Sequence, residues 1–313
     1  LYTHQKEAIE NDKKHIIVTS GTGSGKTETF LLPIVKNLLK ESKEWEHFDG
    51  LKQNNWKNLK LRADKSKNIT TIEGYHREGE SRQSAIRALV LYPLNALVDD
   101  QLIRLRKLFN SDDAIKFLKE KRNGNRIYFG RYTSDTPIPG KCDKPEKIDK
   151  LKEKLEEIEN NQNAKFKGRK KEDEDEAKKK GKYFLPSLDS SEMYSRWDMQ
   201  EYPPDIMITN YSMLNIMLMR NIESPIFEKT KEWLNVKDAS GNYLHKFQLV
   251  IDELHSYRGT AGTEIAYLIR TFLNRIGLES PDDSRLQILA SSASLGDSDA
   301  DSKKILTEFF GVE

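Results

Sequence analysis

Short runs of apolar, β-branched residues recur along the chain between longer stretches with helical periodicity. The runs lack strict alternation of apolar and polar positions, as expected of strands buried on both faces. We expect strands at Ile16–Thr19, Ala88–Tyr92, Ile127–Phe129, Ile206–Thr209, Leu249–Ile251 and Leu286–Ala290. We expect helices at Glu28–Lys40, Ala96–Phe109, Ser212–Arg220 and Thr263–Ile276. This alternation predicts an α/β fold in which helices cover both sides of a parallel sheet.

Two polar stretches interrupt the alternation, at about residues 41–84 and 137–198. In the second stretch, Ile148, Leu151, Leu155 and Ile158 follow helical spacing, which predicts one amphipathic helix. Residues 165–182 are dense in charge and hold almost no apolar residue, which predicts a disordered or mobile loop. A positively charged strip that contacts nucleic acid is the alternative interpretation.

Composition limits the function classes. The chain has 313 residues, enough for one large domain or two small ones, and its formal net charge of +2 excludes a global positive field, so any nucleic-acid surface must be local. Cys142 is the only cysteine, which excludes an intramolecular disulfide and a cysteine-based zinc site. No apolar run reaches the roughly 18 residues of a membrane span. We expect a cytoplasmic protein without a membrane partner, and a chain that starts at Leu1 as part of a longer one.

The segment Ser20–Thr27 reads SGTGSGKT and directly follows the first predicted strand. A glycine-rich turn between a strand and a helix, ending in Lys-Thr, is typical of a phosphate-binding loop. Lys26 would reach the terminal phosphates, and the Thr27 hydroxyl would bind Mg²⁺. The strict pattern has Gly where this chain has Ser20, and a chance glycine loop is the alternative. We predict nucleotide-binding residues at Thr22, Gly23, Ser24, Gly25, Lys26, Thr27 and Glu28.

An acidic pair, Asp252 and Glu253, directly follows the predicted strand Leu249–Ile251. Asp252 would hold Mg²⁺ through water, and Glu253 would orient and deprotonate the attacking water. A charge placed at a helix N-terminus is the alternative for Glu253. Together with SGTGSGKT, the pair supplies both parts of a nucleoside triphosphate hydrolysis site, with Lys26, Asp252 and Glu253 as the catalytic candidates.

The order of these motifs resembles the first RecA-like lobe of superfamily 2 helicases of the DEAD/DEAH type. The resemblance covers nearly the whole chain apart from the two insertions, and it implies a RecA-like parallel sheet, ATP as the nucleotide and a single lobe over residues 1–313. It is carried by Gln5, SGTGSGKT, YPLNAL at 92–97, TNY at 209–211, DELH at 252–255 and SAS at 292–294.

The resemblance also implies roles by position. Gln5 would read the adenine edge, with Tyr2 as a candidate stacking partner. Contacts with the nucleic-acid backbone are implied for Pro93, Asn95, Ala96, Thr133, Ser134, Thr209 and Asn210, for which helix N-capping is the alternative. Coupling between the ATP site and the strand is implied for His255, Ser292, Ala293 and Ser294. Tyr257 and Arg258 would either couple the sites or pack, and Trp197 would either stack on a base or join the core.

Further segments resemble large bacterial helicases with a C-terminal DUF1998-type region, a group that includes MrfA-type repair helicases and helicases of the Druantia and DISARM anti-phage systems. These segments are Met199-Gln200, Pro203–Asp205, TNYSML from 209 and DELHSYRGTAGTE from 252. The resemblance implies an ATP-dependent DNA helicase or translocase acting 3′–5′, in phage defence or DNA repair.

The same group works with a second RecA-like lobe, whose arginine fingers complete the ATP site. We find no such arginine motif before Glu313. We therefore expect half an active site here, with the second lobe, C-terminal regions and defence-system proteins as partners. An ATP-switched nucleic-acid-binding or scaffold module and a DEAD-box-like RNA helicase are the alternatives.

Overall fold

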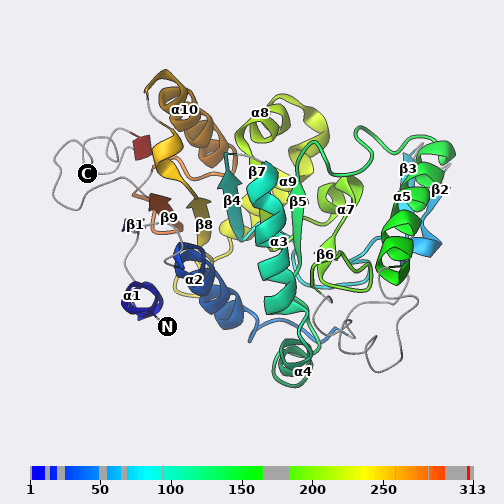
Figure 1. Cartoon of the computed structure of the whole chain (residues 1–313), viewed down its shortest axis with the longest axis horizontal. Helices are drawn as coiled ribbons and strands as arrows, with labels where there is room; N and C mark the ends of the chain where they lie inside the picture. Colours follow the sequence, from blue (N-terminus) through cyan, green and yellow to red (C-terminus); the bar gives the residue numbers. More distant parts are fainter. Residues whose placement is uncertain are drawn as a thin grey trace.

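A computed structural model describes residues 2–10, 15–19, 25–48, 55–64, 69–93, 95–164, 183–257, 259–280, 282–292 and 309–310. Seven strands form one parallel sheet in the order β1-β9-β8-β4-β7-β5-β6 (Figure 1). These strands are β1 (His15–Thr19), β4 (Ala88–Tyr92), β5 (Phe129–Tyr132), β6 (Glu192–Met193), β7 (Ile206–Asn210), β8 (Phe247–Ile251) and β9 (Leu286–Ser292).

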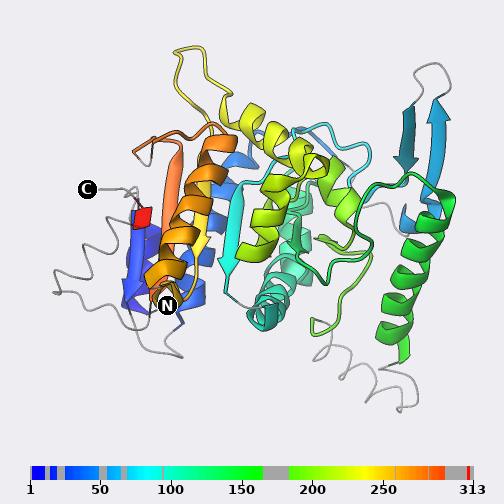
Figure 2. The ribbon, with the colours of Figure 1, turned by 90° about the horizontal axis from the view of Figure 1, so that it is seen from above.

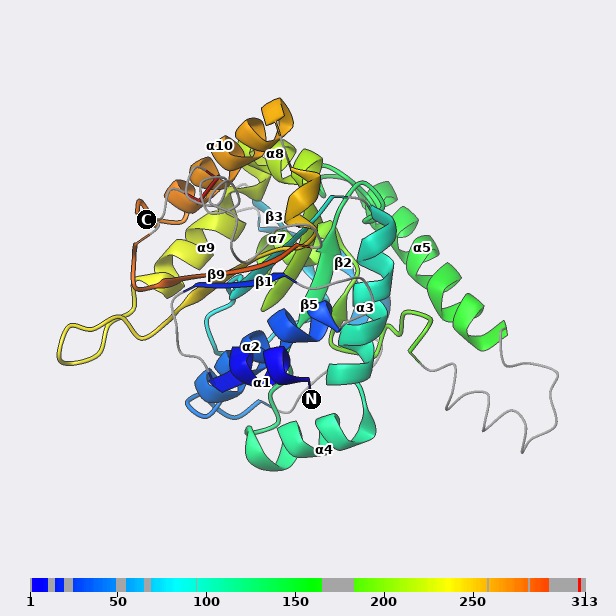
Figure 3. The ribbon, with the colours of Figure 1, turned by 60° about the vertical axis from the view of Figure 1, so that its left-hand side comes forward.

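Helices cover both faces of this sheet. Figure 3 shows α1, α2 and α4 on one side and α8, α9 and α10 on the other. The helices are α1 (Thr3–Glu10), α2 (Lys26–Glu41), α3 (Asn95–Phe109), α4 (Asp112–Lys121), α5 (Pro145–Ala164), α7 (Arg196–Glu201), α8 (Tyr211–Met219), α9 (Ser224–Leu234) and α10 (Gly259–Arg275). Short 3₁₀ turns lie at η1 (Asn55–Asn58), η2 (Asn221–Glu223) and η3 (Leu254–Ser256).

The central strand β4 shows why its sequence lacks alternation. Val90 and Tyr92 pack with α2 and α3 on one face, whereas Leu89 and Leu91 pack with α8, α9 and α10 on the other. All five residues of β4 are buried. A strand covered on both sides must be apolar at every position. The predicted fold class, a RecA-like α/β sheet between helices, is therefore confirmed.

Strand β5 begins later than predicted. The apolar run starts at Ile127, but the Tyr128 amide donates to the Asp205 carboxylate at 2.8 Å instead of to a neighbouring strand. The ladder with β7 starts only at Phe129, which is level with Ile206. A side-chain acceptor from a distant segment thus moves the start of the strand. The prediction of Ile127–Phe129 is wrong by two residues at the start and by three at the end.

The two insertions fold against each other. Strands β2 (Lys60–Asp64) and β3 (Ile69–Glu73) form an antiparallel pair, and α5 packs beside it at the end of the molecule far from β1 (Figure 2). Trp56 and Leu59 from the first insertion share a small core with Leu151 and Leu155 of α5. The predicted amphipathic helix is confirmed. The charged segment 165–182 lies outside the described residues.

A buried ionic cluster holds the amino ends of the central strands together. The Asp205 carboxylate accepts hydrogen bonds from Arg82 Nη2 and Arg87 Nη1, each at 2.9 Å. Its backbone carbonyl accepts from the Arg87 and Ala88 amides. Burial alone would raise the pKa of Asp205, but the charges of Arg82, Arg77 and Arg87 lower it below its ordinary value. The cluster fixes β4, β5 and β7 relative to one another.

None of the helices described is long and apolar enough to cross a membrane. Cys142 is a free, partly buried thiol, and burial raises its pKa to about 11. A thiol with so high a pKa stays protonated near neutral pH and is a weak nucleophile.

Candidate nucleotide and nucleic-acid site

The carboxyl ends of the parallel strands bring the predicted site residues to one edge of the sheet. Asp252 follows β8, and Asn95 opens α3 just beyond β4. Asn210 ends β7 on the other side of β4. Ligands of open α/β sheets bind at this edge. Asp252 and the predicted nucleic-acid residues Asn95 and Asn210 therefore follow adjacent strands, whereas α2 follows β1, two strands away from β8.

Gly25 marks the start of the helix after β1. It has φ 75° and ψ 28°, a left-handed conformation, and α2 begins at the next residue, Lys26. A Cβ atom on Gly25 would lie 2.6 Å from Gln5 Nε2, so a side chain has no room there. The amino end of this 16-residue helix is a favourable anion site through its free amides and its dipole. Thr22, Gly23, Ser24 and the Lys26 side chain lie outside the described residues.

Gln5 ties α1 to this turn. Its Nε2 donates to the Gly25 carbonyl at 3.1 Å, and its Oε1 accepts from the Tyr2 amide at 3.0 Å. Within the part of the chain that the structure describes, these bonds leave one amide hydrogen and one oxygen lone pair of Gln5 unused. Tyr2 is 62% exposed and stacks on His4. Adenine recognition by Gln5 and stacking by Tyr2 stay predictions.

Asp252 is held by the neighbouring strand. Its Oδ1 accepts the hydroxyl of Ser291, which is fully buried in β9, and also the Glu253 amide at 3.0 Å. Ile251 of β8 pairs with Ala290 of β9, so the residues that follow them, Asp252 and Ser291, lie side by side. One carboxylate oxygen is thus positioned by the protein. The predicted role of Asp252 at Mg²⁺ stays a prediction.

Glu253 adopts a backbone conformation that costs energy. It has φ 52° and ψ 48°, the left-handed region, and it precedes the 3₁₀ turn η3. A non-glycine residue there costs on the order of 1–3 kcal/mol and persists only where the surroundings impose it. Such strain clusters at functional sites. The alternative of a simple helix-terminal charge is not favoured, since only a single 3₁₀ turn follows directly.

The donor set fits a nucleotide with Mg²⁺. Thr27 offers a hydroxyl and Asp252 a carboxylate, the hard oxygen ligands that Mg²⁺ prefers. Within the described ranges, no group of three or more His, Cys, Asp and Glu side chains is arranged to hold a metal.

Three predicted nucleic-acid residues meet in one hydrogen-bonded group, here named the Asn95 cluster (Asn95, Ser134, Asp135 and Asn210). Asn210 Nδ2 donates to Asn95 Oδ1 at 2.6 Å. Asn95 Nδ2 donates to Ser134 Oγ at 3.2 Å and to Asp135 Oδ2 at 3.3 Å. The cluster joins the carboxyl ends of β4, β7 and β5. Short amide and hydroxyl side chains of this kind suit backbone contacts that read no base.

Asn210 caps a helix and belongs to the Asn95 cluster, while its contact with nucleic acid stays a prediction. Its Oδ1 accepts the Met213 amide at 2.8 Å, which makes Asn210 the N-cap of α8. Its Nδ2 belongs to the Asn95 cluster. A helix cap and a backbone-contacting residue are therefore compatible at this position.

Thr133 and Thr209 differ from their neighbours because they are buried. The Thr209 hydroxyl donates to the Tyr132 carbonyl at 2.6 Å, and the side chain is fully buried. The Thr133 hydroxyl accepts from the Asp135 amide at 3.3 Å. These hydroxyls shape the turns that carry Ser134 and Asn210. Contact of either threonine with nucleic acid stays a prediction.

The remaining predicted residues are placed as follows. Pro93 follows β4 and is partly exposed, whereas the Ala96 side chain lies outside the described residues. Ser292 ends β9 and is fully buried. The His255 side chain, Ala293 and Ser294 also lie outside the description. The coupling role of His255, Ser292, Ala293 and Ser294 stays a prediction, as does nucleic-acid contact at Pro93 and Ala96.

Tyr257 links the turn after Asp252 to the Asn95 cluster. Its ring meets that of Tyr211 edge to face, with centroids 4.6 Å apart, and Tyr211 directly follows Asn210. A Cβ atom on Gly262 would lie 2.4 Å from the Tyr257 carbonyl, so α10 can approach only with glycine there. The packing interpretation of Tyr257 is confirmed. Arg258 lies outside the described residues.

Trp197 belongs to the core. Its side chain packs with Trp56 and Leu188, and its Nε1 donates to the Gly140 carbonyl at 2.7 Å. With 4% of its surface exposed, it offers no face to a base. The core interpretation is confirmed over the stacking one.

Two residues of the candidate site, Ser291 and Gln101, were not predicted from the sequence. Ser291 lies one residue before the predicted SAS segment, and the register of β9 against β8 reveals its role. Gln101 Nε2 lies 3.4 Å from Thr27 Oγ1. In the sequence, Gln101 is linked to the site only by its position six residues after Asn95 on the same helix.

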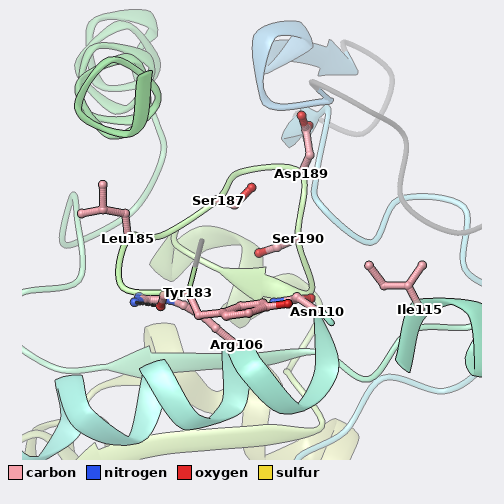
Figure 4. A pocket seen from close by; sticks show the side chains of 8 residues that line it. All are labelled: Arg106, Asn110, Ile115, Tyr183, Leu185, Ser187, Asp189 and Ser190. Atoms are coloured by element: carbon pink, nitrogen blue, oxygen red, sulfur yellow. Dashed lines mark hydrogen bonds between the residues drawn. The ribbon is translucent and has the colours of Figure 1, made fainter. Parts of the chain in front are cut away.

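Two cavities of the described part lie away from this edge. A cleft of about 530 Å³ is lined by Tyr75 and Cys142 of the insertions and by Tyr202 beside α7. A smaller cavity of about 120 Å³ lies at the far end of α3, where Arg106, Asn110 and Tyr183 face the same space (Figure 4). Arg106 is already paired with Glu192. Neither cavity carries a residue predicted to bind nucleotide.

Comparisons with known proteins agree with these motifs. The model of the DEAD/DEAH box helicase family matches residues 2–132. Druantia protein DruE of Escherichia coli (strain UMEA 4076-1) is 34% identical over 331 residues, which cover 94% of this chain but only 16% of DruE. The chain thus spans about a sixth of that relative.

Two solved helicases have low sequence identity to this chain. The DUF1998 helicase MrfA bound to DNA and AMPPNP is 19% identical, with a TM-score of 0.49 over 99% of this chain and 26% of MrfA. Helicase Lhr of Mycobacterium smegmatis bound to ssDNA and AMP-PNP is 15% identical, with a TM-score of 0.48 over 97% of this chain and 24% of Lhr. Residues 2–132 are therefore similar to DEAD/DEAH box helicases, and this match covers fewer than half of the 313 residues.

Proposed function

We propose that residues 1–313 are the first RecA-like, ATP-binding lobe of an ATP-dependent DNA helicase or translocase. One observation carries the proposal. The strained Glu253 turn follows β8, and the Asn95 cluster joins the ends of the next three strands, β4, β7 and β5. A hydrolysis site and a phosphate-contacting cluster on adjacent strands suit an enzyme in which ATP hydrolysis is coupled to contact with nucleic acid.

Each residue then has a defined task. The amino end of α2 and Lys26 would hold the phosphates, and Gln5 would contact the adenine. Glu253 would orient and deprotonate the attacking water, while Ser291 fixes the Asp252 carboxylate. Bound Mg²⁺ would supply neutralisation of phosphate charge, with Thr27 and Asp252 as its protein-side ligands.

We further propose DNA as the substrate and phage defence as the setting, with DNA repair as the second candidate. The DELH sequence and the long insertions favour DNA over RNA. The similarity to a protein named for the Druantia system supports defence. The cytoplasmic location and the defence-system partners stay predictions.

The test uses the full-length protein that contains these residues. ATP hydrolysis is measured without nucleic acid and with single-stranded DNA, duplex DNA and RNA. Displacement of labelled DNA and RNA strands is measured in parallel, with Glu253→Gln as the inactive control. We expect DNA-stimulated hydrolysis and displacement of DNA. Hydrolysis without displacement would favour the switch module, and displacement of RNA alone would favour the RNA helicase.

The 313-residue chain alone provides a further comparison. In the family, the arginine fingers come from a second lobe, so we expect this chain to bind ATP but hydrolyse it slowly. Robust DNA-stimulated turnover by these 313 residues would show that the site needs no second lobe.

A further inference from the structure

Helix α3 touches both halves of the candidate site. Its first residue, Asn95, belongs to the Asn95 cluster at the carboxyl ends of β4, β5 and β7. Its middle turns run beside α2, the helix that follows the phosphate-binding segment (Figures 1 and 3). Both helices pack on the same sheet face through Leu102 and Ile34.

Two polar side chains of α3 reach the first turn of α2. Gln101 Nε2 lies 3.4 Å from Thr27 Oγ1. Arg104 donates to Glu28 and, at 2.9 Å, to Asp100 on its own helix. These contacts meet the two residues that directly follow Lys26.

The Gln101 amide is buried and only half satisfied. Its side chain is 6% exposed, and its Oε1 atom has no hydrogen-bond partner in the described part of the chain. A buried acceptor left without a partner costs about 1–3 kcal/mol. Rotation of the amide would turn Oε1 toward the Thr27 hydroxyl, and the oxygen and nitrogen of such an amide are assigned only by their surroundings. The site therefore has an acceptor ready for the hydroxyl proton when the Thr27 oxygen becomes a ligand.

The geometry makes α3 a rigid connection. Gln101 and Arg104 are three residues apart and so lie on one face of the helix. Gln101 follows Asn95 by six residues, about 9 Å along the axis. A displacement of the helix at Asn95 therefore reaches Thr27 without passing through a flexible segment.

We propose that α3 couples the two sites, with Gln101 and Arg104 as positioning residues that transmit nucleic-acid contact at Asn95 to the Thr27–Glu28 turn. The inference rests on the proposed function, because it assumes that ATP and DNA bind where described. It adds a connection separate from the one that the resemblance implies for the SAS segment.

The experiment measures coupling as a ratio of affinities in the full-length protein. Binding of a fluorescent, non-hydrolysable ATP analogue is titrated with and without single-stranded DNA. Coupled sites typically change each other's affinity by about 5- to 150-fold. In Gln101→Leu/Arg104→Met we expect that factor to fall to about one, because the contacts that join α3 to the Thr27–Glu28 turn are removed. The affinity for single-stranded DNA alone should stay within about threefold, since no residue of the Asn95 cluster is changed.

Matched variants distinguish positioning from general damage. Lys107→Met changes a charged residue of the same helix that faces Phe184, and it should keep the wild-type factor. Gln101→Glu retains an acceptor for the Thr27 hydroxyl and should restore part of the coupling. Arg104 is more than a third exposed, so Arg104→Met alone should fold normally and lower the factor by itself.

The outcomes are separable. If a folded double variant keeps the wild-type factor, α3 does not couple the sites through these contacts. If it loses ATP binding even without DNA, Gln101 belongs to the nucleotide site itself and the positioning role is wrong. If the wild-type protein shows no DNA effect on ATP affinity, the proposed function fails and the inference falls with it.

Discussion

Replacement of Asp205 by Asn tests whether one buried carboxylate organises the sheet. Asp205 accepts from Arg82, Arg87 and the Tyr128 amide at 2.8–2.9 Å, at the amino ends of the strands whose carboxyl ends carry the Asn95 cluster. Asp205→Asn preserves the size of the side chain but removes its charge. Two buried guanidinium groups then lose an anionic partner.

The size of the effect follows from the partners that remain. Removing one member of a buried ion pair costs about 3–5 kcal/mol. Arg82 keeps Glu80 at 2.6 Å and Arg87 keeps Glu41 at 2.7 Å, which favours the lower end of this range. We therefore expect a loss of about 3 kcal/mol in the free energy of unfolding. With an unfolding entropy of about 2.1 cal/mol/K per residue, this corresponds to a Tm lower by roughly 5 °C.

The assay is denaturant unfolding followed by tryptophan fluorescence, together with thermal melting. Trp45 and Trp233 lie 5.4 Å and 5.0 Å from the Arg87 guanidinium, so they report on this region directly. Because the folded-state pKa of Asp205 lies below its ordinary 3.8, its stabilisation is present above pH 3.8 and is lost as the pH falls below that value. The difference between wild type and variant should shrink accordingly.

An exposed ion pair provides the control. Lys57 and Glu159 join the two insertions at 3.1 Å, with side chains 48% and 33% exposed. Glu159→Gln should cost at most about 1 kcal/mol. If Asp205→Asn costs no more than Glu159→Gln, or if its cost does not change below pH 4, the cluster does not hold the strands as described.

Four further predictions concern the site and its surroundings. Lys26→Ala should abolish tight ATP binding by the full-length protein in a binding titration, and retained affinity would contradict the phosphate-binding role. Glu253→Gln should keep ATP affinity and slow hydrolysis by about 10²–10⁴-fold, and near-normal turnover would remove Glu253 as the base. Ser291→Ala should raise the Mg²⁺ concentration for half-maximal hydrolysis about tenfold through Asp252, with an unchanged requirement counting against that contact. Burial raises the pKa of Asp198 to about 7, so its ionisation opposes folding between pH 3.8 and 7. The stability of Asp198→Asn relative to wild type should therefore be higher at pH 8 than at pH 5, and a constant difference would contradict the raised pKa.

The sequence by itself determined the local structure and the chemical inventory. Apolar runs predicted the strands of the large sheet except β6 and the bounds of β5. Helical spacing in Ile148–Ile158 predicted α5, because both signals depend on neighbours within a few residues. The SGTGSGKT and DELH segments predict the nucleotide chemistry, since each motif needs its residues close together in the chain.

Only the tertiary structure decided which of these residues meet. The pairing of Ser291 with Asp252 depends on β9 lying beside β8, and the contact of Asn95 with Asn210 depends on β7 lying beside β4. The shared core of the two insertions joins Trp56 to Leu151, and no local pattern encodes that distance. The order of strands in a sheet is set by the burial of all its faces together, so these contacts appear only once the whole sheet is assembled.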